Sequence, residues 1–440
     1  MEGFVPMVCC LSVALGCAAN DDNPGTAGTE ETTGTQPPSG TAGGAAQGGA
    51  GVATAAASAG GTGGASGTGG KGGTAKGDAA ANAGGSNAAG SNAGGADGSM
   101  PLPPATGTPG KWESVSPPGW AQYLSPPGDY GLGTIVADPA RPTDMYVGGY
   151  GAIWKSTDYG LTWSMLNSKP NPPSLSLGRV LAVAGTSPAT LWMANLLGDQ
   201  KVFKSTDAGL TFRLTGTVPG GHTESLYSII VDPKNSQHLL SGFHEADGLV
   251  ESNDGGETWA YVSSGQGWPG GGKSWYPFFV DTQDGATPMK TWFVIAQGGS
   301  PAMTSDGGAH WATPPSIAKL EHSHGSCALY QNGKSLFIAG IYGPGDGVYR
   351  STDLGATWSK VSSGVEAIVW GTPKNLYTMW MTACPGCYKT APQPGTMWTT
   401  GDTPVPGGSQ SVAVTSDGTH SVFVGSMWGS GPGLWRYVEP

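Results

Sequence analysis

One short motif recurs at nearly regular intervals along this 440-residue chain, and this recurrence constrains the fold more than any other feature. The motif reads S-x-D-x-G-x-x-W in its first copy, and later copies replace the Ser by Thr or the Trp by Phe. The closing aromatics of the five copies are Trp163, Phe212, Trp259, Trp311 and Trp358, which stand 49, 47, 52 and 47 residues apart. Repeats of roughly 40 to 50 residues that each carry four short strands are typical of the blades of a β-propeller.

The first repeat unit divides into four segments with strand character. Alternating, β-branched or aromatic side chains mark residues 134–138 (TIVAD), 145–150 (MYVGGY), 152–156 (AIWKS) and 162–166 (TWSML). Such residues favour strands. We therefore predict an inner, a second, a third and an outer strand in each blade, with the motif between the third and the outer strand.

Two less regular units set the number of blades at seven. Residues 391–398 (APQPGTMW) keep the Gly and the Trp of the motif but lack its Ser and Asp, which predicts a sixth blade. The C-terminal stretch offers only three strands, whereas residues 110–118 (GKWESVSPP) offer one, with Trp112 placed 51 residues before Trp163. Pairing this strand with the three C-terminal ones would close the ring and remove its open edge. We predict an all-β fold, a single seven-bladed β-propeller over residues 111–440 that is closed by an N-terminal strand.

The motif resembles the Asp-box, or BNR, repeat of a propeller superfamily that includes sialidases, sortilin-type receptors and xyloglucan-hydrolysing enzymes. An Asp side chain readily accepts hydrogen bonds from backbone N–H groups of its own turn, which predicts a structural role for it. The structural aspartates are Asp158, Asp207, Asp254, Asp306 and Asp353. The resemblance also implies that the Asp-box face lies opposite the working face. The functional site is therefore expected on the loops that join second to third strands and outer strands to the next inner strand.

The residues before the propeller divide into two parts. Residues 1–17 contain an apolar run too short to span a bilayer, and they end in Ala-Leu-Gly-Cys, which resembles the lipobox of bacterial lipoproteins and implies lipidation of Cys17. Residues 18–110 are rich in Gly, Ala, Ser and Thr and contain too few large apolar side chains to fold, so we predict a disordered linker. The chain is thus expected to be exported and held at the bacterial outer membrane or cell surface by a lipid anchor, or else secreted.

The charge and the cysteine content indicate which partners and which covalent links the protein can have. The formal net charge is −11, and the five Arg residues cannot form a basic stripe, so no nucleic-acid partner is expected. Cys384 and Cys387 form a single C-x-x-C, which predicts a small disulfide loop in an exported protein and is weak evidence for zinc. The sequence does not indicate whether the protein is a monomer or an oligomer.

Polar residues gather on the predicted working rim, mainly in blades three to five. The candidates for acid–base catalysis are His222, His244, Glu245, His322 and His324, and the candidates for ligand contact are Arg179, Lys273, Trp275 and Tyr276. Three interpretations remain open for the histidines. They can transfer protons near a sugar ring, hold a metal together with a carboxylate, or simply bond water and one another. No cofactor is predicted apart from such a rim-bound metal.

The family resemblance also narrows the function. Sialidases bind their acidic substrate with an arginine triad that includes an R-I-P segment, and this sequence has no such segment, so sialidase activity is not expected. Xyloglucan-hydrolysing relatives work in a cleft between two seven-bladed domains, and only one is predicted here. We predict a propeller that binds a glycan or protein ligand at the cell surface. The alternative is a glycoside hydrolase or polysaccharide lyase that uses rim His and Glu residues.

Overall fold

The computed structural model describes twelve segments of the chain. They are residues 105–120, 134–149, 152–166, 180–194, 200–219, 226–321, 329–340, 345–364, 366–380, 387–405, 409–425 and 433–440. The predicted signal segment 1–17 and the predicted linker up to residue 104 lie outside them. None of the helices found in these segments has the length and apolar character that crossing a membrane requires.

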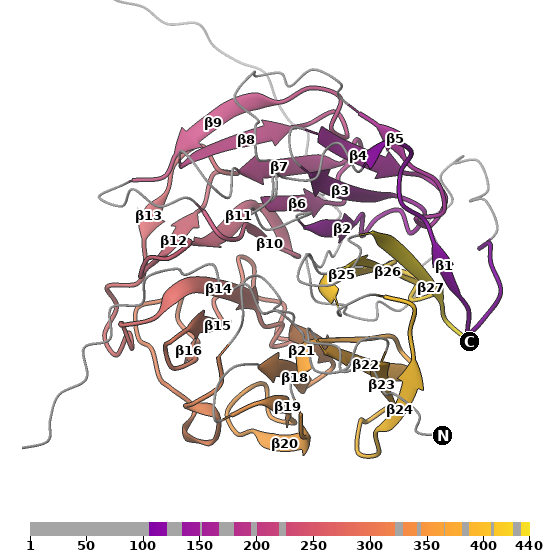
Figure 1. Cartoon of the computed structure of the whole chain (residues 1–440). Coiled ribbons are helices and arrows are strands. Elements are labelled where there is room, and N and C mark those ends of the chain that lie inside the picture. The colour runs from indigo at the N-terminus through magenta and orange to yellow at the C-terminus, as the bar shows by residue number, and fades with distance from the viewer. Residues whose placement is uncertain are drawn as a thin grey trace, which may run out of the picture. The chain divides into compact units, whose positions relative to one another are not determined.

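Seven antiparallel sheets surround a common centre (Figure 1), which confirms the predicted seven-bladed, all-β fold. The first blade comprises β2 (Ile135–Ala137), β3 (Met145–Gly149), β4 (Ala152–Ser156) and β5 (Ser164–Met165). The second comprises β6 (Val180–Ala184), β7 (Thr190–Ala194), β8 (Lys201–Ser205) and β9 (Arg213–Thr217). The third comprises β10 (Ile230–Asp232), β11 (Asn235–Gly242), β12 (Leu249–Ser252) and β13 (Ala260–Tyr261).

The remaining four blades complete the ring. The fourth comprises β14 (Lys273–Phe279), β15 (Trp292–Gln297) and β16 (Ala302–Thr304), and a short 3₁₀ helix, η2 (Pro315–Ile317), follows it. The fifth comprises β17 (Leu329–Asn332), β18 (Ser335–Gly340), β19 (Gly347–Ser351) and β20 (Ser359–Ser362). The sixth comprises β21 (Glu366–Gly371), β22 (Asn375–Trp380), β23 (Cys387–Pro392) and β24 (Thr399–Asp402). The seventh comprises β25 (Ser409–Val414), β26 (His420–Gly425), β27 (Leu434–Val438) and β1 (Trp112–Ser114).

The fourth blade departs from the expected four strands, because its sheet has three strands among the described residues. After the motif, only Ala312 pairs with this sheet, through a single bridge to Met303. The loop that leads into the blade pairs with its motif segment, through a parallel bridge between Gln266 and His310. Gln266 of this loop donates its N–H to the carbonyl of Ala309 at 3.0 Å and accepts the N–H of Trp311 at 2.7 Å.

The ring is closed as the sequence predicts, by β1 pairing with β27 (Figure 1). Arg436 on β27 is fully buried, and its Nε donates to Oε2 of Glu113 on β1 at 2.7 Å. Two described residues before position 111 also contact the last blade. The carbonyl of Thr106 lies 2.8 Å from Nε2 of His420, and the N–H of Gly110 donates to Val438. The N-terminal segment is therefore fastened to the last blade by both strand pairing and a buried ion pair.

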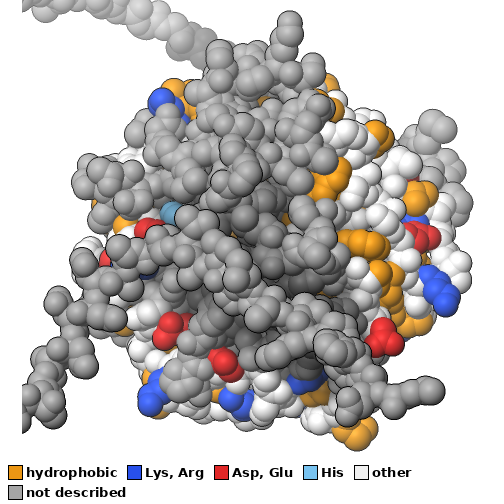
Figure 2. Space-filling model, in the orientation of Figure 1, with side chains coloured by type: hydrophobic (Ala, Val, Ile, Leu, Met, Phe, Trp, Pro, Cys, Tyr) orange, Lys and Arg blue, Asp and Glu red, His pale blue; other side chains and the backbone are white. Residues whose placement is uncertain are grey.

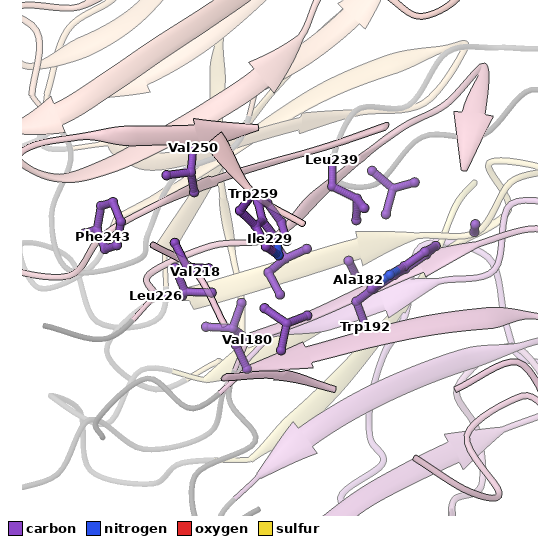
Figure 3. Close-up of a cluster of buried hydrophobic side chains, with 14 residues drawn as sticks. Val180, Ala182, Trp192, Val218, Leu226, Ile229, Leu239, Phe243, Val250 and Trp259 are labelled. Carbon is purple, nitrogen blue, oxygen red and sulfur yellow. The ribbon is translucent and has the colours of Figure 1, made fainter. Parts of the chain in front are cut away.

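Seven buried hydrophobic clusters lie at the interfaces between neighbouring blades. Figure 3 shows the one between the second and third blades, where Trp192 and Val180 meet Leu239 and the motif residue Trp259. The closing aromatics of the motif thus pack between sheets. Truncating such a tryptophan to Ala costs about 3–5 kcal/mol.

The five motif copies form the same hydrogen-bonded turn. In the first copy, Oδ1 of Asp158 accepts the N–H of Thr162 at 2.9 Å, and Oγ of Ser156 accepts the N–H of Gly160 at 2.9 Å. Equivalent bonds occur in the turns of Asp207, Asp254, Asp306 and Asp353. Burial opposes ionisation of Asp158, but the hydrogen bonds from Thr162 and Ser156 and the charge of Arg436 together outweigh it and hold the pKa of this carboxyl below its usual value. The carboxylates are thus engaged within their own turns.

Candidate functional site

Apart from the five aspartates of the repeated turns, the structure describes half of the residues that the sequence singles out. Arg179, His222, His322, His324, Cys17 and Cys384 lie outside the described residues. His244, Glu245, Lys273, Trp275, Tyr276 and Cys387 lie within them. Cys387 is disulfide-bonded, and its pairing with Cys384 stays a prediction.

The described candidates meet where the third blade adjoins the fourth. His244 and Glu245 lie in the loop between β11 and β12, and Lys273, Trp275 and Tyr276 lie at the start of β14. These are a loop from second to third strand and the entry to an inner strand, so both belong to the predicted working rim. We call this set of segments, residues 243–248 and 268–276, the blade 3–4 rim.

Two non-glycine residues of this rim have left-handed backbones and contact each other. Glu245 and Ser274 both have φ of +54°. Ser274 lies in a bulge, because the register of β14 on β15 shifts between Lys273 and Tyr276. The N–H of Glu245 donates to Oγ of Ser274 at 3.0 Å. Residues other than glycine rarely adopt this conformation, which costs about 1–3 kcal/mol and concentrates at functional sites.

The end of β11 approaches the bulge so closely that only glycine fits there. A Cβ on Gly242 would lie 1.8 Å from the carbonyl oxygen of Trp275. The N–H of Gly242 donates to Oγ of Ser228 at 3.3 Å. The two blades are therefore in backbone contact directly beneath the rim, which fixes the position of the Glu245 loop against β14.

The side chain of Glu245 lies between a histidine and a lysine. Its Oε1 is 4.0 Å from Nε2 of His244, and its Oε2 is 3.9 Å from Nζ of Lys273. The side chain of His244 is nearly buried, whereas that of Glu245 is 37% exposed and that of Lys273 is 62% exposed. A solvent-accessible carboxylate with a cation on one side and an imidazole on the other can take part in proton transfer.

Aromatic side chains border this charged group. The ring of Tyr227 stacks on His244 with centroids 5.5 Å apart, and Tyr276 meets Tyr227 edge to face at 6.3 Å. Half-buried Trp268 donates its Nε1 proton to Oδ1 of the exposed Asp247 at 3.2 Å. Rings flanked by hydrogen-bonding carboxylates suit a ligand with both apolar and hydroxylated faces, such as a sugar.

The predicted ligand contact through Trp275 is wrong. Its side chain is fully buried, with Nε1 donating to the carbonyl of Gly272 at 3.1 Å and the ring 4.4 Å from that of Trp268. The bulge at Ser274 turns this side chain into the packing between blades three and four. The partly exposed Trp268 takes its place at the surface.

Sequence reasoning did not single out Ser274 and Tyr227 as site residues. Tyr227 stands in the segment between His222 and β10, and only its stacking on His244 reveals it. Ser274 follows the run Gly270, Gly271 and Gly272, and this glycine-rich entry to β14 was the one available signal of unusual backbone.

A buried histidine away from the rim ties blade three to blade four. Nδ1 of His238 lies 2.8 Å from Oδ2 of Asp232, and Nε2 lies 2.9 Å from Oε1 of Glu251. The same Asp232 oxygen accepts the N–H of Met289 in blade four at 2.7 Å. Burial alone would lower the pKa of His238, but the hydrogen bonds to the two carboxylates outweigh it and raise this pKa above 6.5.

Neither metal ligation nor a basic surface stands out in the part of the chain that the structure describes. It contains no group of three or more His, Cys, Asp or Glu residues placed to hold a metal ion. The rim metal predicted for the histidines depends on His222, His322 and His324, which lie outside that part. On the face drawn in Figure 2, the described Lys and Arg side chains lie scattered towards the periphery.

Comparison with known proteins relates the chain to propellers and, by sequence, to xyloglucanases. No family model matches the chain. A xyloglucanase of Hypocrea jecorina is 27% identical over 275 residues, which cover 53% of this chain and 33% of that enzyme. The chain therefore spans about a third of the length of this relative.

Two solved structures share the fold. The GH74 xyloglucanase from Xanthomonas campestris matches with a TM-score of 0.53 and 18% identity, over 74% of this chain and 53% of that one. YCF48 bound to D1 peptide matches with a TM-score of 0.52 and 14% identity, over 77% of this chain and 99% of that one. At such identities the structural matches show the fold alone. The chain is thus a seven-bladed propeller with sequence similarity to a xyloglucanase over about half of its length.

Proposed function

We propose that this propeller acts on a polysaccharide and contacts it along the blade 3–4 rim. The observation that carries the proposal is Glu245, an exposed carboxylate held between His244 and Lys273 by a left-handed backbone. The similarity to a xyloglucanase supports a glycan as the substrate class. It favours the enzymatic alternative over the ligand-binding function that the sequence suggested first.

In this proposal Glu245 transfers the proton. Cleavage of a glycosidic bond needs a carboxyl group that protonates the leaving oxygen and a second one on the other side of the bond. In the proposed hydrolysis Glu245 gives its proton to the leaving glycosidic oxygen, and Asp247, the other carboxylate of the same loop, takes a proton from the water that attacks the anomeric carbon. Nζ of Lys273, 3.9 Å from Oε2 of Glu245, can stabilise the negative charge that Glu245 acquires when it has given up its proton. Tyr276 and Trp268, both half-buried, supply ring surface for the sugar.

The test is to incubate the full chain with a panel of polysaccharides, xyloglucan and a polyuronate among them. New reducing ends report hydrolysis, unsaturated products report lyase action, and retention on immobilised glycan reports binding. Glu245→Gln should lower turnover by about 10²–10⁴-fold, the usual contribution of an acid–base group. Glu257→Gln is the matched control, because Glu257 is paired with Arg213 on the protein surface away from the rim.

The outcomes separate the candidate functions. Turnover that Glu245→Gln abolishes and Glu257→Gln preserves supports the proposal. Retention on glycan without any new reducing or unsaturated ends would instead support a binding protein. Turnover that is unchanged in Glu245→Gln would remove this residue from the mechanism.

We also propose that the chain is exported and lipid-anchored through Cys17, as the resemblance of residues 1–17 to a lipoprotein signal implies. Radiolabelled palmitate should enter the wild-type protein and not Cys17→Ser. Labelling that persists in Cys17→Ser would contradict this anchor.

A further inference from the structure

The left-handed conformation of Glu245 has a cause in the neighbouring blade. We propose that Ser274 is a positioning residue for Glu245: its hydroxyl accepts the Glu245 N–H and so holds the carboxylate beside Lys273. This inference rests on the proposed function, because it assigns a supporting residue to the same site.

Position 245 carries a glutamate in a backbone conformation that glycine adopts more easily. Glycine adopts a left-handed backbone without steric penalty, and this chain contains 77 glycines. Gly248, three residues later in the same loop, has φ of +133°. Other non-glycine residues with this conformation lie in the repeated turns, at Tyr159, Ala208 and Leu354. Glu245 differs from them because its carboxylate lies between Lys273 and His244, which points to a use for it.

A hydrogen bond from Glu245 to the adjoining blade stabilises this conformation. Oγ of Ser274 accepts the Glu245 N–H at 3.0 Å, and Ser274 is completely buried. Ser274 is itself held at φ +54° within the bulge of β14. The contact of Gly242 with Trp275 keeps the two backbones close enough for this bond. Each left-handed residue is thus stabilised by the adjoining blade.

Loss of this hydrogen bond would displace the carboxylate of Glu245. The bond fixes the peptide plane between His244 and Glu245, and without its acceptor this plane can turn and φ of Glu245 can return to negative values. Such a rotation turns the side chain away from Lys273 and His244, which now lie 3.9 and 4.0 Å from its two oxygens. A displacement of about 1 Å in a reacting group can lower turnover by roughly 100-fold.

The variants that test this are Ser274→Ala and Ser274→Gly in the full chain. Both remove the hydroxyl, but glycine also relieves the left-handed strain at position 274. If Ser274 positions Glu245, both variants should lose roughly 100-fold in kcat with KM changed less than about threefold. If Ser274 had only a structural role in the bulge, Ser274→Gly would keep wild-type turnover, and the proposal would be overturned.

The matched control is Ser252→Ala. Ser252 is a buried serine of the third blade whose hydroxyl also accepts a backbone N–H, that of Gly256, in the repeated turn away from the rim. Its loss should lower the melting temperature while turnover stays within about twofold of wild type. A Ser252→Ala variant as inactive as Ser274→Ala would overturn the specific role of Ser274.

A second readout does not depend on catalysis. Hydrogen exchange of the Glu245 amide, followed by NMR, should be at least tenfold faster in both Ser274 variants than in wild type and unchanged in Ser252→Ala. Unchanged exchange in the Ser274 variants would refute the positioning role. If the wild-type chain neither binds nor cleaves any polysaccharide, the proposed function fails, and the exchange result still decides whether Ser274 holds Glu245.

Discussion

The buried ion pair at the ring closure gives a quantitative prediction for Glu113→Ala. Arg436 is completely buried, and its guanidinium has a charged partner in Glu113 at 2.7 Å. Removing one partner of a buried pair costs about 3–5 kcal/mol, because the other charge stays buried without compensation. The Glu113 side chain is 32% exposed, so water can replace part of its role and we expect the lower end, about 3 kcal/mol.

This loss should be visible in thermal unfolding of the full chain. A domain of this size loses about 2 °C in melting temperature for each kcal/mol, so Glu113→Ala should melt about 6 °C below wild type. The control is Glu257→Ala, which breaks the surface pair with Arg213, whose side chains are 38% and 58% exposed. Exposed pairs contribute under about 1 kcal/mol, so this variant should melt within about 2 °C of wild type.

A double variant distinguishes the cost of an unpaired buried charge from the cost of losing a contact between β1 and β27. Glu113→Ala combined with Arg436→Met removes both charges and should recover most of the loss, because no unpaired charge stays in the interior. Equal melting temperatures for Glu113→Ala and Glu257→Ala would refute the reasoning. So would a double variant less stable than Glu113→Ala alone.

Two further predictions concern groups away from the rim. Because the pKa of His238 is raised in the folded state, its contacts with Asp232 and Glu251 contribute stability that is fully present below pH 6.5 and is lost as the pH rises through the folded pKa. His238→Gln should remove this part of the pH dependence in melting curves between pH 5 and 8, and an unchanged pH profile would contradict it. Asp254→Ala should lower stability by about 1–2 kcal/mol, because Thr258 loses hydrogen bonds to its carboxylate, while glycan turnover stays at the wild-type level. A large loss of turnover at wild-type stability would mean that this turn has a catalytic role.

The sequence allowed most of the fold to be predicted because the fold is periodic. The spacing of the motif aromatics predicted the number of blades. The isolated Trp112 segment predicted that an N-terminal strand closes the ring, which the pairing of β1 with β27 confirms. The missing outer strand of blade four was not predicted. Among the described residues that follow the motif, only Ala312 bridges to this sheet, and Pro314 and Pro315, which follow it closely and lead into η2, lack the backbone N–H groups that further strand pairing would need.

The candidate site was predictable only in part. His244 and Glu245 stand out in sequence because charged residues follow a buried strand, and the blade topology assigns them to the rim. Ser274 and the burial of Trp275 depend on a bulge that reverses which side chain faces outward. A serine in a left-handed conformation has no sequence signature of its own. Its contact with Glu245 could not be predicted either, because the two residues belong to different blades.

The most direct test of the central claim is a structure of the full chain with a bound oligosaccharide from whichever polysaccharide it cleaves. The account predicts a sugar at the blade 3–4 rim, with a hydroxyl or glycosidic oxygen within hydrogen-bonding distance of Glu245 and a ring against Tyr276 or Trp268. A sugar bound on the face of the repeated turns around Asp158 and its counterparts, or at the closure between β1 and β27, would contradict it.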